Sequence, residues 1–182
     1  LINFKEILMA KIFLDKAKAE YKQSFYKYIE SYLAEGETSY YDKYKMALDN
    51  FHEYIKLLEK EGQGTDLPKD RVAQATFWLV DDNFHVLGVT RIRKQALEFG
   101  GNIGYDIAPA YRKKGYGSLI LKLALIKARE MNLQKAIVTC EADNIASKKI
   151  IEKNKGIFIG SLYSEEMKFR ILKYEMSLGI TR

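Results

Sequence analysis

The apolar residues of this chain follow two different spacings along its length. Spacings of three and four residues, typical of a helix with one buried face, occur over 18–35, 42–60, 116–131 and 144–153. The first stretch predicts a helix that ends near Gly36, and the second predicts a single long helix that ends at Gly62-Gln63-Gly64. Several of the apolar positions in these two helices are tyrosines, which we expect to lie in the core or along a cleft: Tyr21, Tyr28, Tyr32, Tyr44 and Tyr54.

Shorter runs rich in β-branched and aromatic residues predict the strands. They occupy 11–14, 73–80, 86–92, 101–107, 135–140, 157–163 and 169–177. Asp81-Asp82-Asn83 is suited to a turn, so the second and third runs are predicted to form a hairpin. The nearly continuous apolar run over 135–140 is typical of a central strand that is covered on both faces.

The order of these elements predicts an α/β (α+β) fold with a mixed central sheet flanked by helices. The chain has 182 residues, which fits one domain over 1–182. Within it, 11–70 holds the first strand and the N-terminal helices, and 73–177 holds the remaining strands and helices.

Composition narrows the class of protein. With 30 Lys and Arg against 24 Asp and Glu, the net charge is +6, which favours an anionic partner without identifying its kind. One Cys and two His make a disulfide impossible within the chain and argue against a metal site. No apolar run is long enough to cross a bilayer, so we expect a cytoplasmic protein that binds no membrane. Residues 1–8 precede Met9, a possible natural start.

The segment 106–117, Asp-Ile-Ala-Pro-Ala-Tyr-Arg-Lys-Lys-Gly-Tyr-Gly, leads from a predicted strand through a short loop into a helix. Glycines there allow the backbone to approach a ligand, and the first turn of the helix has unpaired N–H groups that attract an anion. Arg112, Lys113 and Lys114 add positive charge. The segment is therefore a candidate diphosphate site, although a glycine-bearing helix start with solvated lysines would look the same.

Two common phosphate motifs do not fit this segment. A P-loop requires a lysine directly after its second glycine, and Gly117 is followed by Ser118. A dinucleotide fingerprint requires a third glycine where Ile120 stands.

The pattern Arg112-x-x-Gly115-x-Gly117, after a strand that ends in x-x-Pro, resembles motif A of the GNAT superfamily of N-acetyltransferases. The later stretch 139–158 resembles the same family, with a strand, then Asn144-x-x-Ser147, then Glu-Lys-x-x-Gly-x-Phe. The resemblance covers about 73–177 and extends poorly to the N-terminal helices. The two parts together resemble a poorly characterised bacterial branch of that superfamily.

This resemblance implies a mostly antiparallel sheet in which strands 102–107 and 135–140 splay apart, with acetyl-CoA as co-substrate lying in the gap. Strand residues 105–108 would pair with the pantetheine arm, and a backbone N–H near Ile107 would stabilise the oxyanion of the tetrahedral intermediate. The implied acetyl-CoA contacts are Asp106, Ile107, Ala108, Arg112, Lys113, Lys114, Gly115, Tyr116, Gly117, Ser118, Asn144 and Ser147. Asn144 is equally suited to cap a helix, and Ser147 to lie in its first turn.

The acceptor amine must lose a proton before it attacks, because an alkyl amine has a pKa near ~10.4. Glu141, directly after the central strand, is the first candidate base, and Asp106 is the second unless it faces solvent. The position that carries a tyrosine acid in many family members is Ile151 here. Tyr105 is the first substitute acid, and Tyr111, Tyr163 or water are alternatives.

Arg91 and Arg93 are two residues apart on one predicted strand, so they share a face on which they could bind a substrate carboxylate. An exposed or ion-paired edge would give the same spacing. Cys140 is more easily explained as a buried structural thiol than as a nucleophile.

The leading hypothesis is an acetyl-CoA-dependent N-acetyltransferase that acts on a small-molecule, amino-acid or peptide amine by direct attack in a ternary complex. The alternative is a non-catalytic CoA-binding or regulatory module of the same fold. A nucleic-acid binder ranks last because no such motif is present. A homodimer is possible, and we expect no metal.

Overall fold

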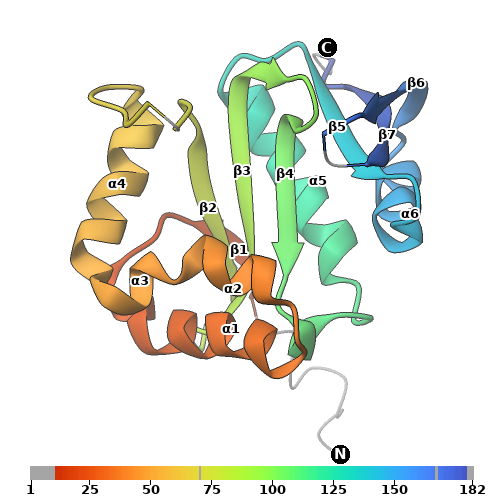
Figure 1. Ribbon diagram of the computed structural model, residues 1–182. Helices are drawn as coiled ribbons and strands as arrows, with labels where there is room; N and C mark the ends of the chain where they lie inside the picture. The colour runs from red at the N-terminus through yellow and green to blue at the C-terminus, as the bar shows by residue number, and fades with distance from the viewer. Residues whose placement is uncertain (1–10, 70, 167, 180–182) are drawn as a thin grey trace, which may run out of the picture.

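A seven-stranded sheet runs through the middle of the molecule in the order β1-β2-β3-β4-β5-β7-β6 (Figure 1). The structure is a computed structural model that describes residues 11–69, 71–166 and 168–179, so the expectations for 1–8 and Met9 lie outside the described residues. The strands are β1 (Phe13–Asp15), β2 (Ala75–Val80), β3 (Val86–Leu97), β4 (Gly101–Ile107), β5 (Lys135–Glu141), β6 (Ile157–Ser164) and β7 (Phe169–Ser177). All neighbouring strands are antiparallel except β4 and β5. This confirms the predicted mixed, mostly antiparallel sheet.

Helices cover both faces of the sheet. The elements are η1 (Ala19–Tyr21), α1 (Lys22–Ala34), α2 (Thr38–Tyr44), α3 (Met46–Asp49), α4 (Phe51–Gln63), η2 (Pro109–Tyr111), α5 (Tyr116–Glu130) and α6 (Ile145–Lys153). Helices α1 to α4 share a core with Trp78 and Val89 of the sheet, whereas α5 and α6 share another with Ile92 and Val138. Among the described residues, no helix is both long and apolar enough to cross a bilayer.

The single helix predicted over 42–60 is wrong, because this stretch belongs to three helices. The chain is extended at Asn50, with φ −150°, and the Asn50 side chain accepts a hydrogen bond from the backbone N–H of Glu53 at 3.2 Å. An Asn-x-x-Glu sequence is a helix-start signal, so the sequence does mark the break between the helices. The helical spacing of apolar residues on both sides of Asn50 hides this signal. The predicted ends are confirmed, since Gly36 and Gly64 both adopt left-handed backbone angles after α1 and α4.

Two strands differ from their predictions. Strand β3 continues beyond Ile92 to Leu97, and its pairing with β4 is interrupted between these two residues by a bulge. Strand β5 is not covered on both faces: Val138 and Cys140 are buried on one side, whereas Thr139 and Glu141 on the other side are half-buried and exposed. Its apolar run therefore concealed a face that stays accessible.

Aromatic side chains fill the core under α1 to α4. Phe25 of α1 stacks on Trp78 of β2 with ring centroids 4.1 Å apart, and Tyr54 of α4 stacks on the same Phe25 at 5.7 Å. All five tyrosines that the spacing placed in the core are buried there. That prediction is confirmed.

A buried carboxylate ties these helices to the sheet. Asp106 of β4 is 6% exposed and accepts hydrogen bonds from the hydroxyls of Tyr28, Tyr32 (3.1 Å) and Tyr44 (2.7 Å). The Arg91 guanidinium of β3 donates to it at 3.2 Å and also to the Tyr44 hydroxyl. The interpretation of Asp106 as a solvent-facing side chain or a second base is therefore wrong, because the helices cover it and its oxygens are already occupied.

The charges around Asp106 decide its protonation. Burial raises the pKa of this carboxyl, but the positive charges of Lys43 and Arg91 and the tyrosine hydroxyls outweigh burial and hold the pKa below its usual value. A depressed pKa means that Asp106 stabilises the fold fully above the pKa of the unfolded chain, about 3.9, and that this contribution is lost as the pH falls through the folded value.

We expect Asp106→Asn to lower the free energy of unfolding by about 3 kcal/mol or more, because it leaves the Arg91 guanidinium buried without its counter-ion. Urea unfolding followed by circular dichroism measures this. The matched control is Asp42→Asn, which removes an exposed pair with Lys45 and should cost less than about 1 kcal/mol. Below about pH 4 the difference between wild type and Asp106→Asn should shrink. A difference that stays constant down to pH 2 would contradict the role given to this carboxylate.

Candidate active site

The central strands β4 and β5 touch at one end and part at the other. Their ladder contains a single pair, Ile103 with Val138. At the closed end the Asn102 side chain accepts from the backbone N–H of Ile137 at 2.8 Å, and a Cβ on Gly101 would meet the Ile137 carbonyl oxygen at 2.4 Å. Only glycine allows the strands to approach so closely there, and beyond Ile103 the two strands diverge, as Figure 1 shows.

The divergence leaves one edge of β4 without a partner. Ala108 donates its N–H to Leu87 of β3 at 3.1 Å. In an antiparallel ladder successive N–H groups point to opposite sides, so the N–H groups of Ile107 and Tyr105 point toward β5. Since β5 has moved away at this level, the opening presents backbone donors and acceptors.

The loop from η2 into α5 presents a second set of free donors. Within the described part of the chain, no backbone N–H from Lys113 to Ser118 donates to any protein acceptor. Lys113 (φ 59°) and Gly115 (φ 87°) adopt left-handed backbone angles, and a Cβ on Gly115 would meet nothing within 4 Å. Six consecutive unpaired amides at a helix N-terminus form a site suited to a diphosphate.

The charged side chains of this loop have two different roles. Arg112 forms a two-pronged ion pair with Glu37, and its Nε donates to the Ile107 carbonyl at 3.0 Å. Its charge is therefore used to hold the loop against the end of α1. Lys113 and Lys114 are exposed and supply the positive charge beside the free amides.

The second glycine of the motif has a packing role. A Cβ on Gly117 would lie 2.5 Å from Cδ1 of Ile150, so α5 and α6 cross closely at this point. Asn154, directly after α6, donates to both the carbonyl and the hydroxyl of Ser118 at 3.2 Å. Helix α6 therefore fixes the first turn of α5 while the N–H groups of that turn stay free.

Asn144 and Ser147 lie at the start of α6. The Asn144 side chain accepts from the Ser147 N–H at 2.9 Å, which is a helix cap as the sequence suggested. The Ser147 hydroxyl lies 2.9 Å from the Tyr105 hydroxyl of β4. Burial raises the pKa of Tyr105 to about 12, so it is protonated at neutral pH.

Glu141 ends β5 on the opposite side of the sheet from Tyr105. It is exposed, and it shares its face with Thr139, toward the N-terminal helices. Burial raises the pKa of Tyr40 in α2, and the charges of Asp106 and Glu141 raise it further, which places Glu141 within electrostatic reach of α2.

The other acid and nucleophile candidates lie elsewhere. Ile151 of α6 is fully buried in the hydrophobic core, and Tyr163 is on the edge strand β6. Cys140 is buried and free, and burial raises the pKa of its thiol, which fits the interpretation as a structural residue. No described Asp, Glu, His or Cys side chains gather in a group of three or more that could hold a metal ion.

The two arginines of β3 are not equivalent. Arg91 is 7% exposed and bonded to Asp106 and Tyr44, so it is occupied inside the protein. Arg93 is half-buried and has no such partner. The sequence missed Lys43, which lies 3.6 Å from Asp106, and Glu37, which lies far from Arg112 in sequence. No local pattern marks either residue.

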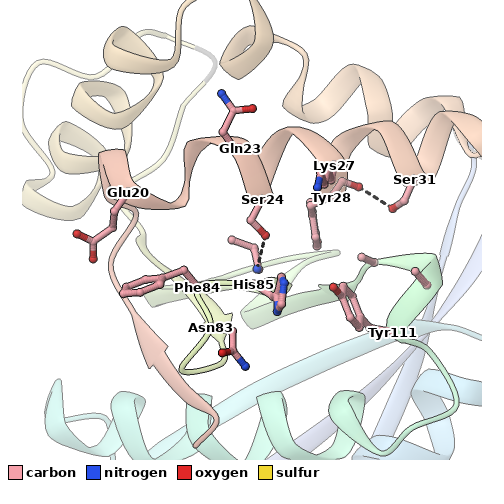
Figure 2. Close-up of a pocket in the computed structure, with 13 residues that line it drawn as sticks. Glu20, Gln23, Ser24, Lys27, Tyr28, Ser31, Asn83, Phe84, His85 and Tyr111 are labelled. Atoms are coloured by element: carbon pink, nitrogen blue, oxygen red, sulfur yellow. Dashed lines mark hydrogen bonds between the residues drawn. The ribbon is translucent and has the colours of Figure 1, made fainter. Parts of the chain in front are cut away.

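A cavity of about 340 Å³ lies apart from the splayed strands, between α1 and the β2–β3 turn (Figure 2). Ala108, Ala110 and Tyr111 form one wall, and His85 lies opposite, bonded to Asp81 at 2.9 Å. None of the free amides, Glu141 or Tyr105 lines it. Tyr111 lines this cavity, and its ring also contacts the ring of Tyr116 and the ammonium group of Lys114.

Three solved structures share the fold at low sequence identity. The ribosomal L7/L12 α-N-protein acetyltransferase RimL, solved with coenzyme A, matches with a TM-score of 0.71 at 14% identity over 94% of this chain and 96% of that one. The microcin C7 self-immunity acetyltransferase MccE, with acetyl-CoA and AMP, matches at 0.67 and 12% identity over 92% of each chain. The Vibrio cholerae spermidine/spermine N-acetyltransferase SpeG matches at 0.55 and 16% identity over 71% of this chain and 74% of that one.

No curated protein matches the sequence significantly. The family model of the GNAT acetyltransferase domain matches residues 17–156, which includes the helices that the sequence motifs did not reach as well as the free amides and both splayed strands. The chain therefore belongs to the GNAT family of acetyltransferases.

Proposed function

We propose that this protein transfers the acetyl group of acetyl-CoA to a primary amine, by direct attack of the amine while both substrates are bound. The observation that carries the proposal is the run of unpaired amides from Lys113 to Ser118 next to the diverging strands β4 and β5. A diphosphate on these amides would direct an attached pantetheine arm along the unpaired edge of β4, where it can pair as an added strand does.

The free edge of β4 supplies an electrostatic contribution to the reaction. The Ile107 N–H, directed into the opening, is suited to donate to the carbonyl oxygen of the thioester as negative charge develops there. Asp106 cannot serve as a base, but its backbone remains part of the edge that pairs with the substrate.

Glu141 and Tyr105 are the proposed base and acid. Glu141 takes a proton from the amine, the amine nitrogen forms a bond to the acetyl carbon, and the carbon–sulfur bond then breaks. The leaving thiolate takes its proton from the Tyr105 hydroxyl, which has a pKa of about 12 and shares a hydrogen bond with Ser147. The two groups lie on opposite faces of the sheet, so each can act on a different side of the thioester.

We expect Gly115→Val to weaken acetyl-CoA binding at least tenfold, because a β-branched residue resists φ 87° and would turn the loop amides away from the diphosphate. Isothermal titration calorimetry with acetyl-CoA measures the change. Gly160→Val is the matched control, since Gly160 also has a positive φ and open space but lies on the edge strand β6. Unchanged affinity in Gly115→Val would refute the diphosphate site.

We expect Glu141→Gln to lower kcat about 10²- to 10⁴-fold while acetyl-CoA binding is kept, because the amide accepts no proton from the amine. Thiol release from acetyl-CoA in the presence of a panel of primary amines reports the rate. Glu130→Gln, at the exposed end of α5, serves as the control. If wild type binds acetyl-CoA tightly and acetylates no amine, the chain is instead the non-catalytic CoA-binding module of this fold.

A further inference from the structure

Positive charge is in excess on the face of the sheet that α1 to α4 cover, next to the opening between β4 and β5. Lys43 of α2 and Arg91 and Arg93 of β3 lie there. Asp106 is paired with Arg91 at 3.2 Å. Glu61, the other buried carboxylate near Arg93, is held by Arg71 at 3.2 Å and by Gln74 at 2.9 Å.

Arg93 has unused hydrogen-bond donors. Its Nε and Nη1 atoms are buried and have no hydrogen-bond partner, and the residue forms no ion pair with any residue that the structure describes. Buried donors are almost always paired in proteins, so an unpaired guanidinium calls for a partner. The accessible part of this half-buried side chain does not include these two atoms, so a partner from solvent reaches them only when the guanidinium turns outward.

A bulge in β3 places this guanidinium over β4. The ladder between β3 and β4 is interrupted after Ile92, and the Asn102 side chain donates to the carbonyls of Arg93 (3.0 Å) and Lys94 (3.3 Å). The Arg93 Nη1 atom thereby lies 3.8 Å from the position that a Cβ on Gly104 would occupy. Glycine has no side chain to separate the guanidinium from the strand. Bulges beside active sites commonly redirect a side chain in this way.

Lys43 lies beside Asp106 and within electrostatic reach of Arg91 and Arg93. Its Nζ atom lies 3.6 Å from Asp106 and about 5.5 Å from the ring centre of Tyr44, and its side chain is 43% exposed. Burial, together with the charge of Arg91, lowers its pKa to about 8, against the attraction of Asp106, which raises it. An anion bound near Lys43 would offset the repulsion between Lys43 and Arg91.

We infer that the acceptor amine carries an anionic group, a carboxylate or a phosphate, which Arg93 binds through its free donors and Lys43 attracts. This inference rests on the proposed acetyl transfer and adds the class of acceptor. The guanidinium lies over Gly104, three residues before Ile107, which corresponds to about 10 Å along a strand. The anion is therefore separated from the amine by several bonds, as in an ω-amino acid, a short peptide or an aminoalkyl phosphate.

Calorimetry on the complex with CoA tests the inference without requiring turnover. The probes are ω-amino acids and dipeptides of increasing length with free or amidated carboxyl groups, and aminoalkyl phosphates with the matching amino alcohols. We expect at least one anionic probe of intermediate length to bind tenfold or more tightly than its neutral partner. Whether the carboxylate or the phosphate series shows this preference identifies the source of the anion.

Variants assign the preference to Arg93. Arg93→Gln should reduce the affinity of the anionic probe to that of its neutral partner, and Arg93→Lys should retain part of the preference, because it keeps the charge and loses the fork. Arg129→Gln, on the exposed end of α5, removes the same net charge and should leave the preference intact. Thermal unfolding confirms that each variant is folded.

Two results overturn the inference: no anionic probe binds more tightly than its neutral partner, or the preference persists in Arg93→Gln. Both differ from failure of the proposed function, which would appear as tight acetyl-CoA binding without transfer to any amine. In a transfer assay, a raised KM with kcat retained for Arg93→Gln would support binding of the anion, and a preference for neutral or cationic amines in the wild type would count against it.

Discussion

The separation of β4 from β5 is the constraint on which the rest of this molecule depends. A strand in the middle of a sheet normally satisfies its backbone groups on both edges, and here one edge of β4 is left open from Ile103 onward. The closed end of the two strands is held by close backbone contact and a side-chain hydrogen bond. Gly101 allows backbone contact with Ile137, and the Asn102 side chain replaces a ladder hydrogen bond. The free edge of β4 and the free amides of Lys113 to Ser118 are separated by the paired amides of Ala108, Tyr111 and Arg112, so the opening and the loop present two separate sets of unsatisfied donors.

The buried Asp106 connects the helices and strands on the face of the sheet that α1 to α4 cover. Its oxygens gather hydroxyls from α1 and α2, and through Arg91 they also bind β3. A charge buried in this way stabilises little by itself, because desolvation opposes the attraction. Its effect is to position the helices, because hydroxyls from α1 and α2 and the Arg91 guanidinium of β3 all meet the same carboxylate. Helices α1 and α2 are thereby fixed relative to the strand that carries the Ile107 N–H.

Local signals are enough to predict most of the fold and the glycine-bearing loop that enters α5. The turn at Asp81-Asp82-Asn83, the ends at Gly36 and Gly64, and the glycines of the loop all depend on a few adjacent residues. Failures arose where the deciding partner is distant in sequence. Asp106 looked like a possible base because nothing near it in the chain shows that tyrosines from α1 and α2 will cover it.

The same reason separates the two arginines of β3. Their spacing correctly places them near each other, but only the bulge and the Asp106 network show that Arg91 is occupied and Arg93 is free. The spacing of residues along a strand predicts which of them share a face of the sheet. The tertiary structure decides which residues on that face still lack a partner.

The two faces of the sheet suit different halves of the proposed reaction. On one face, α5 and α6 pack closely through Gly117 and Ile150, and Tyr105 bonds to Ser147 across the gap, so this side offers a proton to a leaving group and little room for a second substrate. On the other face, Glu141 is exposed and Arg93 has unused donors. An amine that approached from the α5 side would meet a packed helix pair. An amine that approaches from the α2 side meets a carboxylate that can accept its proton and cations that can hold an anionic tail. The proposed direction of approach and the proposed charge of the acceptor therefore have a common origin, which is the asymmetric cover of one splayed sheet.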